Sequence, residues 1–567
     1  MTEHARPDVP LLGAYAAKQC PYRLFREHDP TEAAVPAPPD DALQELFDDG
    51  IAFEASIGEE LVELHGDAVA VIPGRSEAEP DERRALTDAA LAAGTPIILG
   101  ALMQRDTTGR RLGEIDVLLR VGDRYRPIDV KHHRCTTNAD EDSDEAEDTE
   151  EAADGLSTPV QTLDLLGPAV AVAGLEAKYR EDDCLQLAHY YRMLQAHGYA
   201  EPHAVGGIIG TERVVAWFDL ESPRFSTLTP QQSDGAITYH RRHRTTKRTA
   251  LDRYDFEFDF RLRVVDEAIE RRDRSASPPV LPVSVVECTR CPWHDPCHAD
   301  MEAVDDVSLV KPVGYPEWSV HRFMGVTTVT QLAALDPATY VDTPLTEHAL
   351  VNQIRSAQAA VAGQMLIDPD WDESLVPRAD VEIDLDLENA ARVYLWGARL
   401  SRVPDDWPEP AGSYTAFASF DELDDVGEAE LVARLWAWLD DIGRRAAGRT
   451  VRIYGYSIGS TEVAALRRIA AGGAVPGLPS IDDVMALPWV DLLPLMRRKY
   501  WSNWGHGLKV VAAAAGFAWR DDDPGGYASM GWYRDAVAGV DREANIARLL
   551  MYNEDDCAAT AALRVSP

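Results

Sequence analysis

Two aspartates and a lysine in the first quarter of the chain have the side chains needed to cut a phosphodiester. Asp116 is followed by Asp129, and Lys131 comes two residues later. Carboxylate oxygens bind divalent cations, and an ammonium group can orient a water molecule and offset charge on a transferring phosphoryl group. The trio therefore predicts metal-dependent phosphodiester hydrolysis. The alternative is a set of solvated charges at strand ends, which are common on protein surfaces.

The segment that must bring the trio together is typical of a β-hairpin. Apolar residues alternate with others over 115–119, a Gly-Asp turn follows at 122–123, and a second short run comes at 128–130, with Ile128 and Val130 on either side of Asp129. Asp129 and Lys131 are two residues apart on the second strand, so we expect both to point to one face.

Three of the seven cysteines are closely spaced. Cys288, Cys291 and Cys297 form a C-x2-C-x5-C group, and Cys20 lies far earlier in the chain. In a cytoplasmic protein this spacing favours a metal over a disulfide. Four thiolates suit Zn2+ or a [4Fe-4S] cluster equally well by count. The remaining cysteines are isolated, and we expect them to pack in the interior: Cys135, Cys184 and Cys557.

The hairpin resembles the core of the PD-(D/E)xK nucleases, with Asp116 as the first acid and Asp129-Val130-Lys131 as the D-x-K. An early cysteine joined to a late C-x2-C-x5-C, with such a hairpin between them, resembles the iron–sulfur RecB-like exonucleases, which include CRISPR-associated exonucleases and AddB-type helicase–nuclease subunits. The resemblance implies that Cys20 and the three late cysteines hold a structural [4Fe-4S] cluster. Such a cluster would join the two ends of the domain and close a long loop. Zn2+ stays the alternative at these four cysteines.

Two further motifs of this family have counterparts here. The segment Gly50-Ile-Ala-Phe-Glu54 is expected to begin a helix and matches an upstream motif that often carries histidine. The resemblance makes Glu54 an assisting metal ligand, and an exposed helix acid is the alternative. Gln186-Leu-Ala-His-Tyr190 matches the family's Q-x3-Y helix. Residues four apart share a helix face, so Gln186 and Tyr190 are expected to orient the site.

A second group of acids is expected on one face of a strand that opens near residue 381. Alternation over 381–389 puts apolar residues on one side and four acids on the other: Glu382, Asp384, Asp386 and Glu388. Four acids on one strand face repel each other unless cations or bases neutralise them. Residues 393–400 are predicted to form the next strand of the same sheet.

Asp386-Leu-Glu388 resembles the first motif of the DEDD exonucleases, which have an RNase H-like fold. Tyr552-Asn-Glu-Asp-Asp556 resembles the Y-x3-D of the tyrosine variant, and Glu462 stands about where the second-motif aspartate belongs. The resemblance implies that these four acids hold two metal ions, with Tyr552 positioning the attacking water. Asp384-Leu-Asp386 would serve equally well as the first motif. Because glutamate replaces aspartate at 462, a domain that binds nucleic acid without cutting it is the alternative.

The whole arrangement resembles a family of bacterial and archaeal RecB-like nucleases. It implies an α/β multidomain protein with a restriction-endonuclease-like PD-(D/E)xK domain at 1–302, which carries a disordered acidic insert at 138–155. A small helical module follows at 303–376, and an RNase H-like domain of the DEDD type occupies 377–567. In the module, the region around Gly325 resembles a helix-hairpin-helix, and a plain helical linker is the alternative.

The charge argues at first against a nucleic-acid substrate. The chain has 55 basic and 96 acidic residues, a net charge of -41, which should repel DNA. Part of this charge is local, because 140–154 holds ten acids and no base. Basic residues at 240–244 and 247–248 are expected to supply local basic surface, with a solvated loop as the alternative, and local charge matters more for binding than the sum. No apolar run is long enough to span a bilayer, so we expect a cytoplasmic protein without a membrane partner.

We therefore expect a metal-dependent deoxyribonuclease that uses Mg2+ or Mn2+ and acts on DNA ends or single strands, in DNA repair, recombination or defence. RNA is an alternative substrate. No G-x4-G-K-[ST] phosphate loop is present, so unwinding would need a separate helicase as partner. The competing function is a nucleic-acid-binding scaffold with inactive sites in a repair or defence complex.

Overall fold

The structure is a computed structural model that describes most of the chain: residues 9–39, 41–138, 160–168, 170–228, 231–233, 236–238, 245–273, 277–340, 343–473, 475–521 and 526–564. The prediction that the acidic insert begins at residue 138 is wrong, because Asn138 belongs to strand β5 (Thr136–Asn138). Its backbone pairs with Leu175 of β7 (Leu175–Ala177). The rest of the insert and the basic residues 240–244 lie outside the described residues.

The chain divides into two compact units, Met1–Val304 with Val341–Pro344 and Asp305–Tyr340 with Leu345–Pro567. The helical residues after 304 thus belong to the same unit as the strands beyond 377, and the division into three domains stays a prediction. Among the described residues, no helix combines the length and apolarity that crossing a membrane requires.

The first unit contains a seven-stranded sheet in the order β1-β2-β3-β4-β8-β9-β6. Pairs β1/β2 and β4/β8 are parallel and the other neighbours antiparallel. The strands are β1 (Val69–Val71), β2 (Ile97–Leu102), β3 (Glu114–Val121), β4 (Arg124–Val130), β6 (Val160–Gln161), β8 (Val205–Ile209) and β9 (Val215–Asp219).

The predicted hairpin is confirmed as β3 and β4, with Gly122 at φ +64° in the turn, a conformation that glycine adopts without strain. Its second strand begins at Arg124, earlier than predicted. Tyr125 is buried in the core, and this apolar ring extends the strand beyond the run at 128–130.

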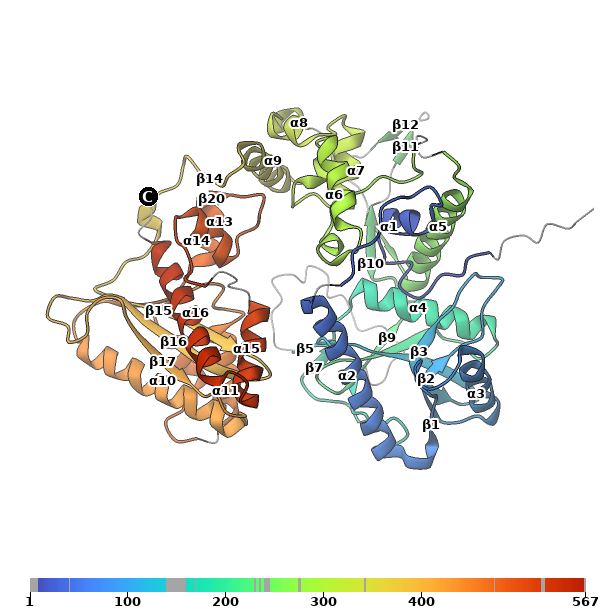
Figure 1. Ribbon diagram of the computed structural model, residues 1–567, viewed down its shortest axis with the longest axis horizontal. Coiled ribbons are helices and arrows are strands. Elements are labelled where there is room, and N and C mark those ends of the chain that lie inside the picture. Colours follow the sequence, from blue (N-terminus) through green and yellow to red (C-terminus); the bar gives the residue numbers. More distant parts are fainter. Residues whose placement is uncertain are drawn as a thin grey trace, which may run out of the picture. The chain divides into compact units, whose positions relative to one another are not determined.

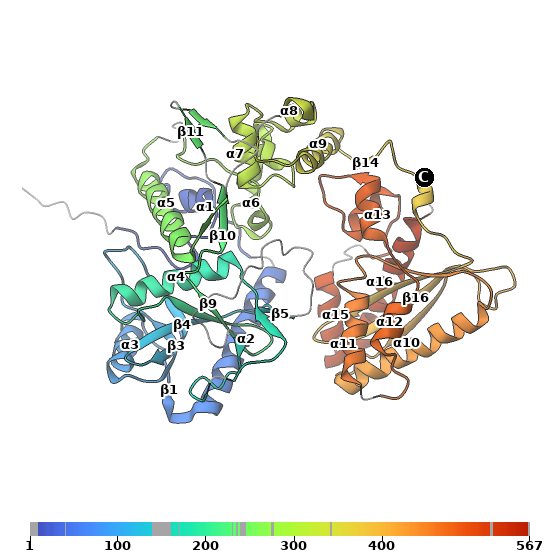
Figure 2. The same cartoon turned by 180° about the vertical axis from the view of Figure 1, so that it is seen from behind.

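Helices cover both faces of this sheet (Figures 1 and 2). Ile57 and Leu61 of α2 pack with Val117 and Ile128 on one face, and Leu194 of α4 packs on the other. The helices are α1 (Pro21–His28), α2 (Asp41–His65), α3 (Pro80–Ala93), α4 (Glu181–Ala196), α5 (Ala250–Glu270) and α6 (His294–Ala303). Short strands complete the unit: β10 (Phe225–Leu228) with β13 (Thr245–Arg248), and β11 (Gln231–Ser233) with β12 (Ala236–Thr238).

The prediction that a helix begins at Gly50 is wrong, because α2 already begins at Asp41. Residues 41–49 include good helix formers, and one interior glycine costs only about 1 kcal/mol, which a long helix tolerates. Glu54 therefore lies in the middle of a 25-residue helix rather than in its first turns.

The second unit opens with helices α7 (Tyr315–Phe323), α8 (Val329–Ala333) and α9 (Glu347–Ala362), which share a core that contains Val320, Leu332 and Leu350. Gly325 lies between α7 and α8 at φ +81°, in the turn where the helix-hairpin-helix resemblance places it. Nucleic-acid binding by this turn stays a prediction.

A five-stranded sheet in the order β17-β16-β15-β18-β19 follows. The strands are β15 (Val381–Asn389), β16 (Val393–Arg402), β17 (Ser413–Ala418), β18 (Val451–Gly455) and β19 (Trp489–Asp491). β15 pairs antiparallel with β16 and parallel with β18, which confirms the predicted strands at 381–389 and 393–400. A short pair joins β14 (Leu366–Ile367) to β20 (Tyr500–Trp501).

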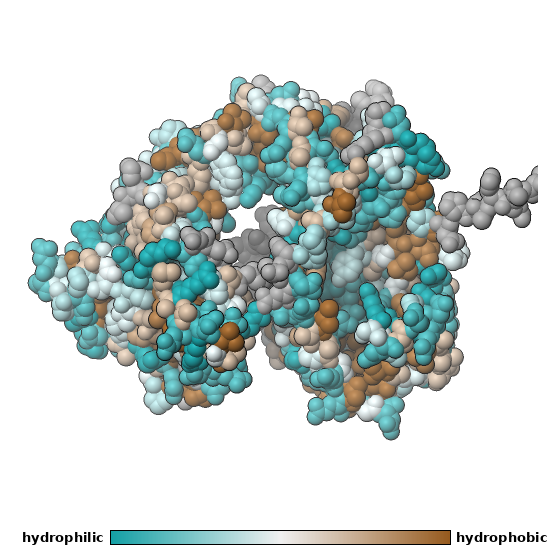
Figure 3. Space-filling view, in the orientation of Figure 1, coloured by the Kyte–Doolittle hydropathy of each residue, from teal (hydrophilic) through white to brown (hydrophobic). Residues whose placement is uncertain are grey.

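The alternation of β15 separates two environments. Ile383 and Leu385 pack with Leu435 of α10 (Asp425–Arg445). The acids face α16 (Arg542–Ala562) on the other side, where Asn553 contacts Asp386 (Figure 1). The helices are α10 (Asp425–Arg445), α11 (Glu462–Gly472), α12 (Ile481–Ala486), α13 (Leu492–Lys499), α14 (Leu508–Ala514), α15 (Gly526–Ala538) and α16 (Arg542–Ala562). On the face shown in Figure 3, hydrophobic residues lie scattered among hydrophilic ones.

Candidate active sites

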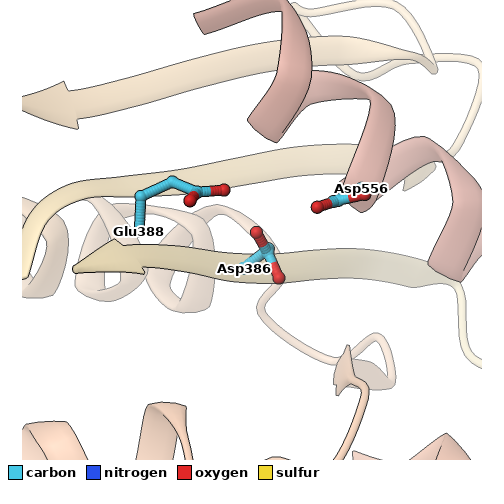
Figure 4. A group of neighbouring side chains, drawn as sticks. All are labelled: Asp386, Glu388 and Asp556. Atoms are coloured by element: carbon cyan, nitrogen blue, oxygen red, sulfur yellow. The ribbon is translucent and has the colours of Figure 1, made fainter. Parts of the chain in front are cut away.

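Three carboxyl groups of the second unit meet between β15 and α16. Asp386 and Glu388 lie two residues apart on β15, and Asp556 lies on α16. One carboxylate oxygen of each lies within 4.8 Å of those of the other two. Figure 4 shows the three side chains directed toward a common space. Within the described part of the chain, this is the one group of three acidic, histidine or cysteine side chains with that spacing.

The four acids on this face of β15 divide into two pairs. Asp384 is buried and is held by the guanidinium group of Arg564, with Nη2 2.9 Å from Oδ2. Glu382 accepts from Arg378 at 2.7 Å and lies 3.5 Å from Arg564. No arginine or lysine of the described residues lies within 4.0 Å of the carboxylate oxygens of Asp386 or Glu388. This difference favours Asp386-Leu387-Glu388 over the earlier register as the metal-binding pair.

Neutral side chains hold the carboxyl groups of Asp386, Glu388 and Asp556 by hydrogen bonds. The Asn553 amide donates to Asp386 Oδ2 at 2.8 Å, and the Ser529 hydroxyl donates to Glu388 Oε2 at 3.0 Å. The Trp519 indole donates to Asp556 Oδ1 at 2.7 Å. These hydrogen bonds orient each carboxylate without cancelling its charge.

Asn553 itself is held by Tyr414, whose hydroxyl donates to Asn553 Oδ1 at 2.8 Å. Gly397 on β16 leaves the necessary room, because a Cβ at that position would lie 1.7 Å from Asn553 Oδ1. Asn553 was missed by sequence reasoning, although it directly follows Tyr552 in the Y-x3-D motif.

The electrostatics of this site favour a bound cation. Burial, and then repulsion by Asp556 and Glu388, raise the pKa of Asp386 well above its ordinary value. Burial and the charge of Asp556 raise the pKa of Glu388 to about 8. Burial also raises the pKa of Asp556, although Lys509 opposes the shift. Buried carboxylates with too little positive charge around them are a donor set that a hard dication fits.

Glu462 lies close to this group without joining it. It begins α11, is buried, and accepts a hydrogen bond from the Thr461 hydroxyl. Burial raises the pKa of Glu462 to about 7, and its charge contributes to the raised pKa of Asp386. It is absent from the group within 4.8 Å, so its role as a direct metal ligand stays a prediction.

Tyr552 is linked to a lysine that sequence reasoning did not assign to the site. Lys509 Nζ donates to the Tyr552 hydroxyl at 2.6 Å and lies 4.5 Å from the ring centroid. The signal was available, because lysine is rare here: seven of the 55 basic residues are lysines. Burial raises the pKa of Tyr552, so its hydroxyl keeps its proton at neutral pH.

In the first unit, the hairpin brings Asp116, Asp129 and Lys131 together as predicted. The pairing of Val117 with Ile128 puts Asp116 opposite Asp129. Asp116 Oδ2 accepts from the Val130 amide at 2.7 Å, and Lys131 Nζ lies 2.5 Å from Asp129 Oδ2. Lys131 comes directly after the last residue of β4.

Helix α4 completes this group of side chains. Gln186 Nε2 donates to Asp129 Oδ1 at 3.0 Å and to the Tyr190 hydroxyl at 2.9 Å, and both side chains are buried. Burial alone would lower the pKa of Lys131, but the carboxylate of Asp129 raises it above its ordinary value. Lys131 therefore carries a full positive charge.

Glu54 lies on α2 near the same site and is exposed to solvent, as the alternative of a helix acid expects. Partial desolvation, followed by the charges of Glu114 and Asp129, raises the pKa of Glu54. Burial and repulsion by Asp129 and Glu54 likewise raise the pKa of Asp116 well above its ordinary value. The three acids repel one another, but their oxygens do not gather as tightly as those of the second unit.

The four predicted ligand cysteines line one cavity of the first unit, together with Trp293 and Met301. Cys20 precedes α1, and its backbone amide donates to Glu287 Oε2 at 2.8 Å, directly before Cys288. The structure thus joins the N-terminal segment to the late C-x2-C-x5-C group. The other cysteines are buried as expected: Cys135, Cys184 and Cys557.

Comparison with protein families identifies the class of the C-terminal part. A family model described as RNase H superfamily matches residues 453–566, which include Glu462, Tyr552 and Asp556. Strand β15, with Asp386 and Glu388, precedes the match and pairs with β18 inside it. Residues 453–566 thus belong to an RNase H-like domain, which suggests a nuclease-like, nucleic-acid-hydrolysing function. Comparisons with curated proteins and with solved structures found no match.

Proposed function

We propose that the chain is a metal-dependent deoxyribonuclease whose principal active site is the Asp386–Glu388–Asp556 group. One observation carries the proposal: the carboxyl groups of half-buried Asp386 and of buried Glu388 and Asp556 converge, without an arginine partner among the described residues, in a domain that contains an RNase H superfamily match. Mg2+ and Mn2+ take such oxygen ligands. A bound dication would supply Lewis-acid stabilisation of charge on the phosphate.

The protein's own residues prepare this site. Asn553 and Ser529 hold Asp386 and Glu388 in fixed orientations, which lowers the cost of reorganisation during the reaction. The protonated Tyr552 hydroxyl accepts from Lys509 and is hydrogen-bonded to Asp556, which places it where it can help to hold a water molecule at that carboxylate. Lys509 adds positive charge where the phosphate must approach three acids.

The first unit supplies a second proposed active site of the PD-(D/E)xK type. Asp116 and Asp129 would hold the metal with help from Glu54, and Lys131 would stabilise charge on the phosphate. Gln186 and Tyr190 orient Asp129. The support is the convergence of an ammonium group and two carboxylates on one hairpin.

We propose that the cysteine cavity holds a [4Fe-4S] cluster, with Zn2+ as the alternative. A tetrahedral zinc site with bonds of about 2.3 Å places its sulfurs about 3.8 Å apart. All four cysteines lie within the described residues, yet no three of their sulfurs lie within 4.8 Å of one another. This absence of a tight sulfur group is compatible with a larger cluster held by Cys20 and the late cysteines.

DNA ends or single strands are the proposed substrates, in repair, recombination or defence, with any unwinding left to a separate helicase. The test is cleavage of labelled single- and double-stranded DNA and RNA by the full chain in Mg2+, Mn2+ or EDTA. We expect metal-dependent cleavage of DNA that Asp386→Asn reduces and Glu430→Gln, an exposed acid on α10, leaves unchanged. Absence of cleavage on every substrate would establish the scaffold function instead.

A further inference from the structure

We propose that Lys18 is a second phosphate-binding cation of the first unit's active site, and that it contacts the substrate beside Lys131. The inference rests on the proposed nuclease function of that site. It assigns a role to a residue outside the hairpin, in the segment directly before Cys20.

Lys18 is connected to the site by a short chain of hydrogen bonds. Its Nζ donates to Gln186 Oε1 at 2.9 Å. The amide nitrogen of the same Gln186 donates to Asp129 Oδ1 at 3.0 Å and to the Tyr190 hydroxyl at 2.9 Å. One glutamine thus joins the Lys18 ammonium group to an acid of the D-x-K motif.

The two lysines lie beside the same tyrosine ring. Lys18 Nζ lies 4.4 Å and Lys131 Nζ 5.6 Å from the centroid of the Tyr15 ring. Their positive charges interact, and an anion bound between the two ammonium groups would be attracted by both of them.

The partners of the two lysines differ. Lys131 is paired with Asp129 at 2.5 Å. No carboxylate oxygen of a described residue lies within 4.0 Å of Lys18 Nζ, whose hydrogen bond goes to a neutral amide. Asp183, the nearby acid on α4, is paired instead with His133 at 3.4 Å. A partly buried cation without an ion pair can bind an anion with little competition from the protein.

The backbone after Lys18 is held firmly. Arg261 donates to the Gln19 carbonyl oxygen at 2.9 Å, and the Cys20 amide donates to Glu287 at 2.8 Å. A cation placed by such contacts is positioned before the substrate arrives. The geometry suits donation from Lys18 Nζ to a non-bridging oxygen of the cleaved phosphate or its neighbour. This contact forms and breaks no covalent bond.

The experiment uses the full chain with Asp386→Asn, so that cleavage reports the first unit alone. Lys18→Met removes the charge, Lys18→Gln keeps a hydrogen-bond donor for Gln186, and Lys18→Arg keeps the charge. Lys178→Met, at an exposed position, is the matched control. Each protein is tested for kcat/KM on single-stranded DNA, and for Kd by fluorescence anisotropy in Ca2+. The oligonucleotides carry one neutral methylphosphonate at each position around the cleaved bond.

We expect Lys18→Met and Lys18→Gln to lose about tenfold or more in kcat/KM, and Lys18→Arg to recover part of the loss. One methylphosphonate position should impair the enzyme with Lys18 but cause no further loss in Lys18→Met. That loss of sensitivity identifies a direct contact, which a merely structural role would not produce.

Two results would overturn the inference while the proposed function stands. In the first, Lys18→Gln retains full activity, which would make Lys18 a positioning residue for Gln186. In the second, every methylphosphonate reduces the activity of Lys18→Met by the same factor as that of the parent. If the parent shows no cleavage, the proposed function of this site fails. The binding measurement then decides whether Lys18 contacts DNA. Equal Kd values for Lys18→Met and Lys178→Met would then overturn the contact as well.

Discussion

The guanidinium group of Arg564 holds the carboxylate of Asp384, although the two residues lie 180 positions apart in the chain. Asp386, two residues further on the same strand face, has no such partner among the described residues. One strand therefore carries an acid neutralised for stability and an acid left available for a cation. This division is the strongest structural argument that the second unit binds metal.

Arg564→Met is expected to destabilise the second unit by about 3–5 kcal/mol, because it leaves Asp384 buried and unpaired. Urea unfolding, with hydrogen exchange of β15 to locate the change, measures the effect. The double variant with Asp384→Asn should recover part of the loss. Arg444→Met, at an exposed arginine of α10, is the control, and an Arg564 variant no less stable than this control contradicts the assignment.

Glu388 should make the metal-free protein less stable at high pH. Its folded-state pKa is raised from 4.5 to about 8, so its contribution to stability is complete below pH 4.5 and is lost as the pH rises through 8. In EDTA at pH 8.5, Glu388→Gln should therefore be more stable than the parent, by an amount on the order of a few kcal/mol.

Thermal unfolding at pH 4.5 and pH 8.5 measures this difference, with Glu430→Gln as control. Mn2+ should raise the unfolding temperature of the second unit in the parent at pH 8.5 and have little effect on that unit in Glu388→Gln. A parent that is equally stable in EDTA and in Mn2+ would show that the three acids hold no metal.

Lys131→Met should reduce cleavage by the first unit about 100-fold or more in an Asp386→Asn background, because it removes charge stabilisation at the phosphate. DNA binding should persist, since other cations remain. Cleavage kinetics and anisotropy titration separate the two effects. Loss of binding in step with cleavage would show that Lys131 acts only in substrate affinity.

The cysteine cavity should contain iron in protein purified without oxygen, at about four atoms per chain, with visible absorption. Cys297→Ser should lose the iron and lower the stability of the first unit. Cys184→Ala, at a buried cysteine away from the cavity, should keep the full iron content. If metal analysis finds zinc instead of iron, without visible absorption, the cavity binds the alternative metal.

The sequence was most informative where chemistry lies in short segments. The β3–β4 hairpin, the Q-x3-Y face of α4 and the alternation of β15 all follow from local spacing, and the structure has each of them. The residues that were missed act across long distances in the chain. Lys18 reaches Gln186 across 168 positions and Ser529 reaches Glu388 across 141, and no local pattern marks such pairs.

The choice between two registers on β15 shows the same limit. Asp384 and Asp386 are equivalent by alternation, and only the position of Arg564, in the last turn after α16, separates them. The predicted start of α2 was wrong because the local signal at Gly50 was misleading. The local pattern predicts a helix boundary at Gly50, whereas the burial of Ile57 and Leu61 against the sheet stabilises a helix that continues through it.

The most direct test of the account compares four full-length proteins on end-labelled single-stranded DNA in Mn2+: the parent, Asp386→Asn, Lys131→Met and the double variant. We predict that the parent cuts, that each single variant keeps part of the activity, and that the double variant has none. Cleavage by the double variant at the parent's rate would show that neither group of acids is an active site.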